Sequence, residues 1–425
     1  MPARSPIAPA RLRILIVAEH ASAAFGGEAF LPLHYFRVLR ARGIEAWLVC
    51  HGRVEHEIRD AFPNDQDRLY FIRDMPVHRG LWAISSRLPK RVEGLTSGAA
   101  SHLLTQLLER RIVRRLVREK QVDVVHEPIP VSPRQPSAMF DVGAPVVIGP
   151  MNGDMNYPPA WSHLEGRVPG IALQAARRAA NLMNRLIPGK RRAALLLVAN
   201  ERTRAALPRT VRGVRVVELP ENGVDLSRFS LRARTTRPEG EPIRFAFVGR
   251  LIALKAVDVL LAALAQMTEA GAPALEIFGD GEERAALERL TRELGLEKRV
   301  TFHGFLEQGE VARRLAEMDA LVLPSLRECG GAVVLEAMAI GLPVIATRWG
   351  GPADYLDETC GILVEPRERV EFTRDLRDAM SALARDDGRR QALGEAGRRK
   401  VISTYDWERK LDRMLELYGE VASRS

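Results

Sequence analysis

Residues 320–346 read ALVLPSLRECGGAVVLEAMAIGLPVIA, and this stretch decides the fold class. A short aliphatic run, Ala320–Leu323, is followed by a loop with Gly330 and Gly331 and then by an apolar, alanine-rich helical segment. A second aliphatic run follows at Pro343–Ala346. Two short apolar runs joined by a helix are typical of a βαβ unit, in which both strands are parallel. The stretch therefore predicts an α/β protein with a parallel sheet.

The same alternation extends outward from this unit and occurs twice in the chain, which predicts two similar α/β domains. The strands predicted for the first lie at Leu12–Ala18, Glu45–Cys50, Val122–His126, Pro145–Ile148, Leu195–Ala199 and Val214–Leu219. Those predicted for the second lie at Ile243–Val248, Ala274–Phe278, Val300–His303, Ala320–Leu323, Pro343–Ala346 and Ile362–Val364. Between the two sets, residues 232–242 (RARTTRPEGEP) lack periodicity and are predicted to be a linker.

Length and composition agree with two domains of an ordinary globular protein. The chain has 425 residues, of which 46% are hydrophobic and 28% are charged, and a domain takes about 150 residues. Three widely spaced cysteines indicate neither a disulfide framework nor a zinc site. The first apolar run is too short for a signal peptide, and no stretch reaches the roughly 18 apolar residues that span a bilayer. We expect a cytoplasmic protein.

The net charge of +9 is divided unevenly along the chain. Residues 1–225 carry 33 Lys and Arg against 21 Asp and Glu, whereas residues 226–425 carry 30 against 33. Much of the excess lies in residues 101–120, where an apolar stripe is expected opposite five arginines, and in residues 167–192, which hold seven basic residues and no acid. Two interpretations stay open: surface helices that pack on the sheet, or a peripheral docking face for an anionic membrane.

The loop and helix after Leu323 hold two acids, Glu328 and Glu336, on either side of a Gly-Gly turn. The small residues at Gly330 and Gly331 allow the backbone to approach a ligand closely, and the free N–H groups at the start of the helix, from Ala332 on, suit a diphosphate. Glu336 lies farther along that helix, where an ionised carboxylate can accept hydrogen bonds from two ribose hydroxyls. The alternative is that both acids only pair with charges of the fold. We favour a ligand site.

Two cations follow the first strand of the second domain in VGRLIALKA, where Gly249 precedes Arg250 and Lys255. Open α/β sheets bind their ligands beyond the carboxyl ends of the strands. Cations at this position would neutralise a diphosphate, and they would help most as it leaves during bond cleavage. We therefore expect the site to work without a metal ion.

The first domain offers fewer candidates. A glycine-rich turn at Gly26 and Gly27 follows its first strand, but neither GxGxxG nor GxxxxGK[ST] is present. His126 ends a predicted strand, at a position where it could face a ligand cleft. The DxD of Asp65 and Asp67 lies in a polar loop with no strand leading into it, and we interpret it as solvated loop and not as a metal site.

Together these motifs resemble the retaining glycosyltransferases of family 4, which have the GT-B fold. GGE at residues 26–28 is similar to that family's N-terminal glycine loop, and ENGVD at 221–225 to its interdomain segment. VGRLIALKA is similar to the family's donor-phosphate motif, FGDGEE to its GDG turn and TFHGF to one of its strand ends. ECGGAVVLE is similar to its EX7E element and GGPADYL to its GG-acid segment. The chain departs from the family pattern at Ala256, where glycine is usual, at Cys329–Gly330, and at Asp354, where Glu is common.

The resemblance implies two Rossmann-like domains that face each other across a central cleft. The first, acceptor-side domain would span residues 1–225, with residues 405–425 crossing back onto it as a last helix, and the second, nucleotide-sugar-binding domain would span 226–404. Glu336 would then hold the ribose, Glu328 the transferred sugar, and His126 would contact that sugar from the first domain. Arg250 and Lys255 would hold the diphosphate. The glycines and Ala332 would line the substrate.

The function expected is transfer of a hexose from a nucleotide diphosphate sugar to an acceptor hydroxyl, with retention of anomeric configuration and without a metal or other cofactor. The acceptor would be a glycan or a lipid-linked molecule of polysaccharide, glycan or glycolipid assembly. A nucleotide-sugar epimerase on the same fold and a non-catalytic protein that binds lipid surfaces stay open as alternatives. Nucleic acid is not expected as a partner, because the few aromatic residues are not interleaved with the arginines.

Overall fold

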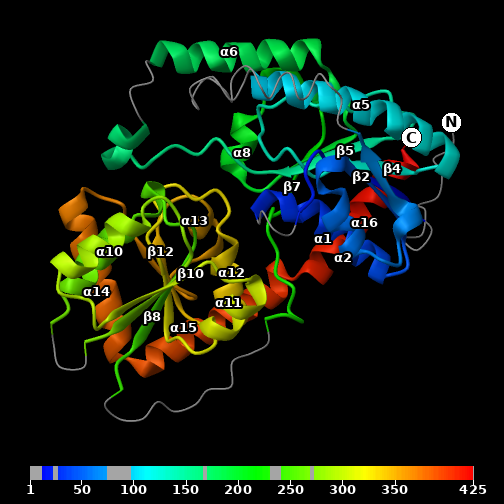
Figure 1. Cartoon of the computed structure of the whole chain (residues 1–425). Coiled ribbons are helices and arrows are strands. Elements are labelled where there is room, and N and C mark those ends of the chain that lie inside the picture. The colour runs from blue at the N-terminus through cyan, green and yellow to red at the C-terminus, as the bar shows by residue number, and fades with distance from the viewer. Residues whose placement is uncertain are drawn as a thin grey trace. The chain divides into compact units, whose positions relative to one another are not determined.

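The computed structural model describes residues 12–22, 27–73, 97–165, 170–229, 241–268 and 272–424. It divides into two compact units (Figure 1). Unit 1 comprises Met1–Asp154, Pro169–Glu221 and Leu411–Ser425, and unit 2 comprises Met155–Val168 and Asn222–Lys410. Most of the linker expected at 232–242 lies outside the described residues. The segment Met155–Val168 lies within the range expected for the first domain, yet it is part of unit 2.

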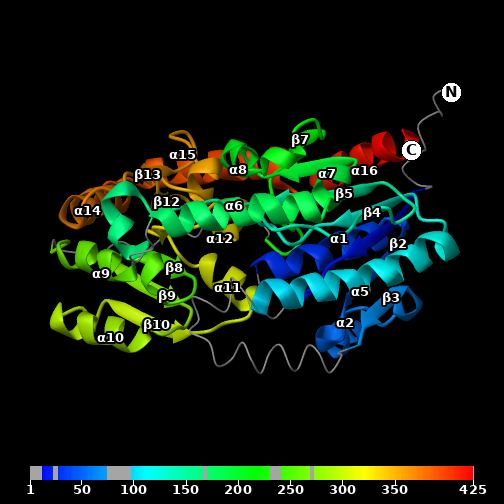
Figure 2. The same ribbon diagram turned by 90° about the horizontal axis from the view of Figure 1, so that it is seen from above.

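Unit 1 is built on a parallel sheet with strand order β3-β2-β1-β4-β5-β6-β7 in the part of the chain that the structure describes. The long helix α5 contacts β1, β2 and β3, and Figure 2 shows it along the side of the unit where these strands lie. The strands are β1 (Arg13–Val17), β2 (Glu45–His51), β3 (Leu69–Ile72), β4 (Val124–Glu127), β5 (Val146–Met151), β6 (Leu195–Val198) and β7 (Val216–Glu218). The helices are α1 (Phe30–Ala41), α2 (Glu55–Ala61), α5 (Ser97–Lys120), α6 (Gly170–Leu186), α7 (Gly189–Arg192) and α8 (Glu201–Ala206).

Unit 2 repeats this architecture with the order β10-β9-β8-β11-β12-β13 among its described strands. Helices α10 and α14 lie on one face of this sheet and α11 and α12 on the other, as Figure 1 shows. The strands are β8 (Arg244–Val248), β9 (Ala274–Phe278), β10 (Val300–Gly304), β11 (Ala320–Leu323), β12 (Val344–Thr347) and β13 (Ile362–Val364). The helices are α9 (Val257–Ala265), α10 (Arg284–Glu293), α11 (Gln308–Leu315), α12 (Ala332–Ala339), α13 (Gly351–Tyr355), α14 (Arg369–Arg385) and α15 (Asp387–Lys400).

The apolar runs of the sequence explain why both sheets are parallel and central. Strand β11 pairs with β8 and β12, and all four of its residues are fully buried. Strands that are covered on both faces have no solvent side, so they are apolar throughout and do not alternate with polar residues. The twelve predicted strands are all present, with ends that differ from the prediction by at most three residues. The resulting order places the loops after β8, β9, β10 and β11 at the same edge of the sheet.

The last helix, α16 (Trp407–Ser423), begins in unit 2 and continues into unit 1 from Leu411 on. Its predicted apolar stripe is confirmed, because each of its members is at most 6% exposed: Trp407, Leu411, Met414, Leu415 and Tyr418. Within unit 1 the helix is held by ion pairs between Arg42 and Asp412 and between Arg215 and Glu420. The expected return of the chain to the first sheet is therefore present.

Candidate functional site

The loop after β8 and the loop after β11 bring two of the predicted residues together. Lys255 ends a single 3-10 turn, η7 (Ala253–Lys255), and its Nζ forms an ion pair with the carboxylate of Glu328. The two side chains are only 14% and 16% exposed. A pair so shielded from water interacts more strongly than a pair on the surface. Lys255 therefore orients Glu328, a contact that the sequence did not predict.

Two loops near Glu328, the one before α12 and the one before α13, each need a glycine. Gly331, the residue at which α12 begins, has φ of 73°, a left-handed conformation that other residues adopt only at a cost. Gly351 donates its N–H to the carbonyl oxygen of Glu328 over 2.8 Å, and a Cβ at this residue would lie 2.6 Å from the carbonyl oxygen of Cys329. The loops 328–331 and 349–351 are therefore packed backbone against backbone.

The N-terminus of α12 has no side-chain cap. The first N–H groups of a helix lack partners within the helix, and they carry the positive end of its dipole. Here those groups follow Gly331 directly, and the ion pair of Lys255 with Glu328 belongs to the preceding loop. The arrangement suits an anion that lies between the helix and a lysine.

Glu336 is half-buried on α12, and its Oε1 accepts a hydrogen bond of 2.8 Å from Nε2 of Gln308. Gln308 begins α11 after the carboxyl end of β10, so the carboxylate of Glu336 is connected to the edge of the sheet at which Glu328 lies. Burial raises the pKa of Glu336, and the hydrogen bond from Gln308 lowers it to a smaller extent. Sequence reasoning missed Gln308, because nothing local marks a contact between residues so far apart.

Arg250 follows Gly249 at the carboxyl end of β8 and is exposed. Within the described residues it forms no ion pair, in contrast to Lys255. An unpaired guanidinium at this edge suits two parallel hydrogen bonds to a phosphate or a carboxylate. The predicted cations thus differ, since Lys255 is shielded and paired whereas Arg250 is accessible to solvent.

His126 does not have the accessible position that the sequence suggested. Its ring is fully buried in unit 1, where Nε2 lies 2.6 Å from the carbonyl oxygen of Gly149 and Nδ1 lies 2.7 Å from the hydroxyl of Tyr418. Nε2 must therefore carry the proton, and Nδ1 accepts from Tyr418. Tyr35 packs edge-on against the ring at 4.8 Å. These contacts give His126 a structural role within unit 1, and its contact with a sugar stays a prediction.

The remaining candidates of unit 1 are described only in part. Gly26 lies outside the described residues, and Gly27 opens an exposed turn before α1. In the DxD segment Asp67 is exposed, as expected of a solvated loop, whereas Asp65 is half-buried and forms an ion pair of 2.8 Å with Arg40. Among the described residues no three His, Cys, Asp or Glu side chains are grouped as metal ligands would be.

The basic helix α5 also differs from the prediction. Val113, Leu116 and Val117 are buried as expected, but Leu107 is 44% exposed. The buried face toward its N-terminus is polar instead, because Gln106 and Glu109 lie in the core, where Gln106 donates to Glu127. The expected continuous apolar stripe is therefore wrong in its first half. No described helix is long and apolar enough to span a membrane.

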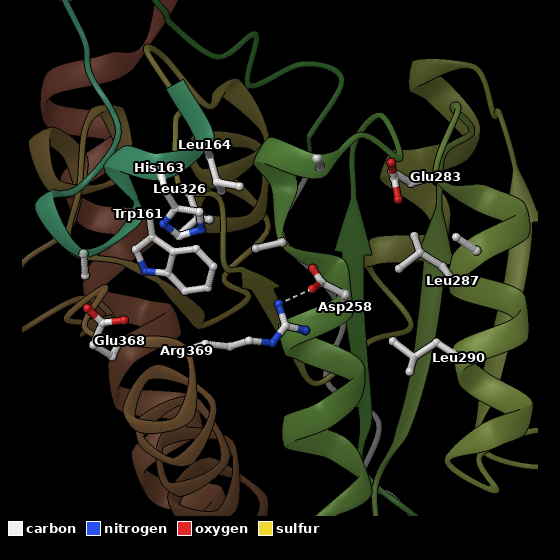
Figure 3. Close-up of a pocket in the computed structure, with 14 residues that line it drawn as sticks. Trp161, His163, Leu164, Asp258, Glu283, Leu287, Leu290, Leu326, Glu368 and Arg369 are labelled. Carbon is white, nitrogen blue, oxygen red and sulfur yellow. Dashed lines mark ion pairs between the residues drawn. The ribbon is translucent and has the colours of Figure 1, made fainter. Parts of the chain in front are cut away.

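Unit 2 also contains a mainly apolar pocket of about 290 Å³ (Figure 3). Its walls come from α9, α10, the start of α14 and the 3-10 helix η5 (Pro159–Glu165), and an ion pair of 2.6 Å joins Asp258 to Arg369 in its lining. The lining residues labelled in the figure are Trp161, His163, Leu164, Asp258, Glu283, Leu287, Leu290, Leu326, Glu368 and Arg369. None of the predicted site residues lines it, but Ala253 and Ala256, which lie on either side of Lys255 in the chain, do.

The two parallel-sheet units define the GT-B class of α/β fold. Solved structures of this class resemble the chain over nearly its whole length. One of them is Anabaena Alr3699/HepE in complex with UDP, which matches with a TM-score of 0.67 and 17% sequence identity, over 96% of this chain and 100% of that chain. A likeness at this level of identity shows the fold alone.

The family follows from the sequence of unit 2. Residues 228–400 match the model of the family described as glycosyl transferases group 1, and this part of the chain belongs to that family. The D-inositol 3-phosphate glycosyltransferase of Salinispora arenicola is 34% identical over 251 residues, which are 53% of this chain and 55% of that protein. The lipopolysaccharide core biosynthesis glycosyltransferase LpsE of Rhizobium meliloti is 32% identical over 187 residues, 44% and 52% of the two chains. The chain thus spans about half the length of the curated relatives it matches.

Proposed function

We propose that this protein is a retaining glycosyltransferase of family 4 that moves a hexose from a nucleotide diphosphate sugar to an acceptor hydroxyl. The observation that carries the proposal is the ion pair between Lys255 and Glu328 at the uncapped start of α12. It combines a cation, a carboxylate and free helix N–H groups, which are the groups that a diphosphate and an attached sugar require. The match of unit 2 to the group 1 family supports the same assignment.

In this proposal unit 2 binds the donor. Glu336 accepts hydrogen bonds from the two ribose hydroxyls, for which its half-buried carboxylate must be ionised. Arg250, Lys255 and the N–H groups that follow Gly331 bind the diphosphate, and Glu328 binds hydroxyls of the sugar. Gly249, Gly330 and Ala332 provide the backbone against which the donor lies. Unit 1 binds the acceptor, and the family resemblance adds the glycine turn that contains Gly27 to the substrate site.

The proposed transfer occurs on one face of the sugar. The bond from the anomeric carbon to the diphosphate oxygen breaks while the acceptor oxygen forms its bond on the same side, and the acceptor proton passes to the departing oxygen. Negative charge grows on the diphosphate in this step, so Lys255, Arg250 and the α12 terminus stabilise the transition state more than the ground state. Glu328 is paired with Lys255 and partly shielded, which argues against a covalent glycosyl-enzyme intermediate. The two cations replace a metal ion.

The relatives supply the candidates for donor and acceptor. HepE was also solved in complex with UDP-glucose, and the two curated relatives are named for D-inositol 3-phosphate and for lipopolysaccharide core biosynthesis. We propose a glycan or lipid-linked acceptor in polysaccharide or glycolipid assembly, at the cytoplasmic face of a membrane. UDP-glucose is the first donor to test.

The test is a panel of UDP-, GDP- and ADP-sugars, with release of the nucleoside diphosphate measured with and without glycan and lipid-linked acceptors. The proposal predicts release from one donor class, accelerated by an acceptor, and an α-linked product from an α-linked donor. Conversion of the donor sugar without any acceptor would show an epimerase instead. Vesicle binding without turnover of any donor would show a lipid-binding protein and refute the proposal.

A further inference from the structure

The segment Met155–Trp161, here called the bracing segment, comes from the stretch GPMNGDMNYPP, whose role the sequence does not reveal. The chain is fixed just before it in unit 1, where Asn152 donates to Glu221 over 2.7 Å and Arg134 pairs with Asp154 at 3.0 Å. From Met155 on it belongs to unit 2. A strand-to-helix connection of the first half of the chain therefore packs on the second unit.

Its first residue packs beneath the loop that carries Glu328. Met155 is 5% exposed and lies against Gly350, so closely that a Cβ at residue 350 would stand 2.5 Å from its Sδ. The same Cβ would also crowd the carbonyl oxygen of Glu328, so Met155 and this oxygen lie on one side of Gly350, and the next residue, Gly351, donates its N–H to the oxygen over 2.8 Å. The side chain of Met155 thus packs beside the backbone of Glu328 and fills the space that Gly350 leaves open.

The next two residues of the bracing segment bind the neighbours of that contact. The backbone carbonyl of Asn156 accepts a hydrogen bond of 2.9 Å from Nε1 of Trp349, the residue before Gly350. The guanidinium of Arg327, the residue before Glu328, lies over the ring of Tyr157 at 5.8 Å. Both loops that enclose Glu328 are therefore held by one short segment.

The far end of the bracing segment is anchored in the core of unit 2. Nε1 of Trp161 donates to the carbonyl oxygen of Arg367 over 2.8 Å, and its ring packs edge-on against the fully buried Phe372 at 6.1 Å. Trp161 points into the pocket of Figure 3 beside His163. Because Trp161 is anchored in the core of unit 2, the bracing segment is held on the same unit as Gly350.

We propose that the bracing segment positions Glu328, with Met155 as the positioning residue, and so determines the rate of transfer and the choice of sugar without affecting how the nucleotide is held. The inference rests on the proposed function. Its physical basis is that Glu328 touches the sugar whereas Arg250, Lys255 and Glu336 hold the rest of the donor. A displacement of about 1 Å at a reacting group costs on the order of a hundredfold in rate.

The experiment compares Met155→Ala with three other variants of the full chain. Met155→Leu refills the space under Gly350, and Trp349→Phe keeps the ring but removes the hydrogen bond to Asn156. Met318→Ala is the matched control, because Met318 is also a buried methionine of unit 2, 2% exposed, but lies at the opposite, amino end of β11. For each variant, kcat and KM are measured with the best donor of the panel and with the other sugars on the same nucleotide. The Kd of the nucleoside diphosphate is measured by calorimetry.

For Met155→Ala we expect a loss in kcat of about ten- to a hundredfold and an altered ratio between sugars, with the nucleoside diphosphate Kd changed less than about threefold. Met155→Leu should restore most of kcat, and Trp349→Phe should lose less than Met155→Ala. If Met155→Ala behaves like Met318→Ala, or weakens the nucleotide as much as it lowers kcat, the inference is wrong. Glu328→Gln separates the two proposals: if it leaves transfer unchanged, the proposed function fails, and the inference fails with it.

Discussion

Substitutions of Lys255 and of its partner Glu328 should change the affinity for UDP in opposite directions. Lys255 pairs with Glu328, and in our proposal it also binds the diphosphate of the donor. The carboxylate of Glu328 therefore competes with the diphosphate for one cation. We expect Lys255→Met to weaken the binding of UDP and Glu328→Gln to strengthen it, even though both variants should lower the rate of transfer.

The magnitudes follow from the burial of the pair. At an effective dielectric constant of about 20, a charge contact at about 4 Å amounts to roughly 4 kcal/mol before desolvation. Since both side chains retain about one seventh of their exposure and desolvation opposes the contact, we expect about half of this, ~2 kcal/mol, to be lost with Lys255. This corresponds to about a thirtyfold higher Kd for UDP. Glu328→Gln removes a negative charge that lies farther from the diphosphate than Lys255 does. We therefore expect UDP to bind about three- to tenfold more tightly.

Calorimetric titration of UDP into the wild type, the two single variants and the double variant measures these effects as a double-mutant cycle. The double variant should bind UDP more tightly than Lys255→Met alone, because it lacks the unpaired carboxylate. Thermal unfolding of each variant serves as the control for the fold. The reasoning would be refuted if Glu328→Gln weakened UDP binding, or if the two substitutions were strictly additive.

Three further predictions concern the rest of the chain. Burial lowers the pKa of Lys190 to about 7, against ~10.4 in an unfolded chain. The unfolded state therefore binds more protons between these values, and the free energy of unfolding rises with pH from about 7 to about 10. Lys190→Met should remove this rise, which amounts to about 1.4 kcal/mol per pH unit, and an unchanged pH dependence in urea titrations would show that the pKa of Lys190 is not lowered. If Arg250 and Lys255 replace a metal ion, transfer should survive EDTA, and loss that Mg²⁺ or Mn²⁺ restores would disprove this. Helix α6 exposes Leu182 and Leu186 next to arginines. The fraction of protein that sediments with vesicles should therefore rise with their content of anionic lipid, at roughly 1 kcal/mol per basic residue. Equal binding to neutral vesicles would argue against docking on an anionic membrane.

The sequence predicts the strands of this fold well, because a strand covered on both faces must be apolar over its whole length. The strand that it misses, β3, follows the polar loop at Asp65, and its two middle residues, Tyr70 and Phe71, are only half-buried. The four residues of β3 (LYFI) are apolar and aromatic, but the run is short and stands at the edge of the sheet. A short apolar run next to a polar loop is therefore easily overlooked, whereas the longer central strands are not.

The candidate site is predicted in part. Glycines at tight turns and charges beyond strand ends are local features, and Lys255, Glu328 and Gly331 follow from them. The buried network of His126 and Tyr418 joins residues that are far apart in sequence, so the position at a strand end could not predict it. The same is true of Met155 and Gln308, whose contacts with Gly350 and Glu336 depend on how distant loops pack.

In our proposal, unit 2 holds a nucleoside diphosphate through Glu336 and the start of α12. The most direct test is calorimetry of UDP with the wild type and with Glu336→Ala, beside Glu310→Ala as a control for an acid on the neighbouring helix α11. We expect micromolar binding to the wild type and to the control, and at least about a hundredfold weaker binding to Glu336→Ala, with its thermal midpoint retained. Equal affinity of Glu336→Ala and the wild type would contradict the account.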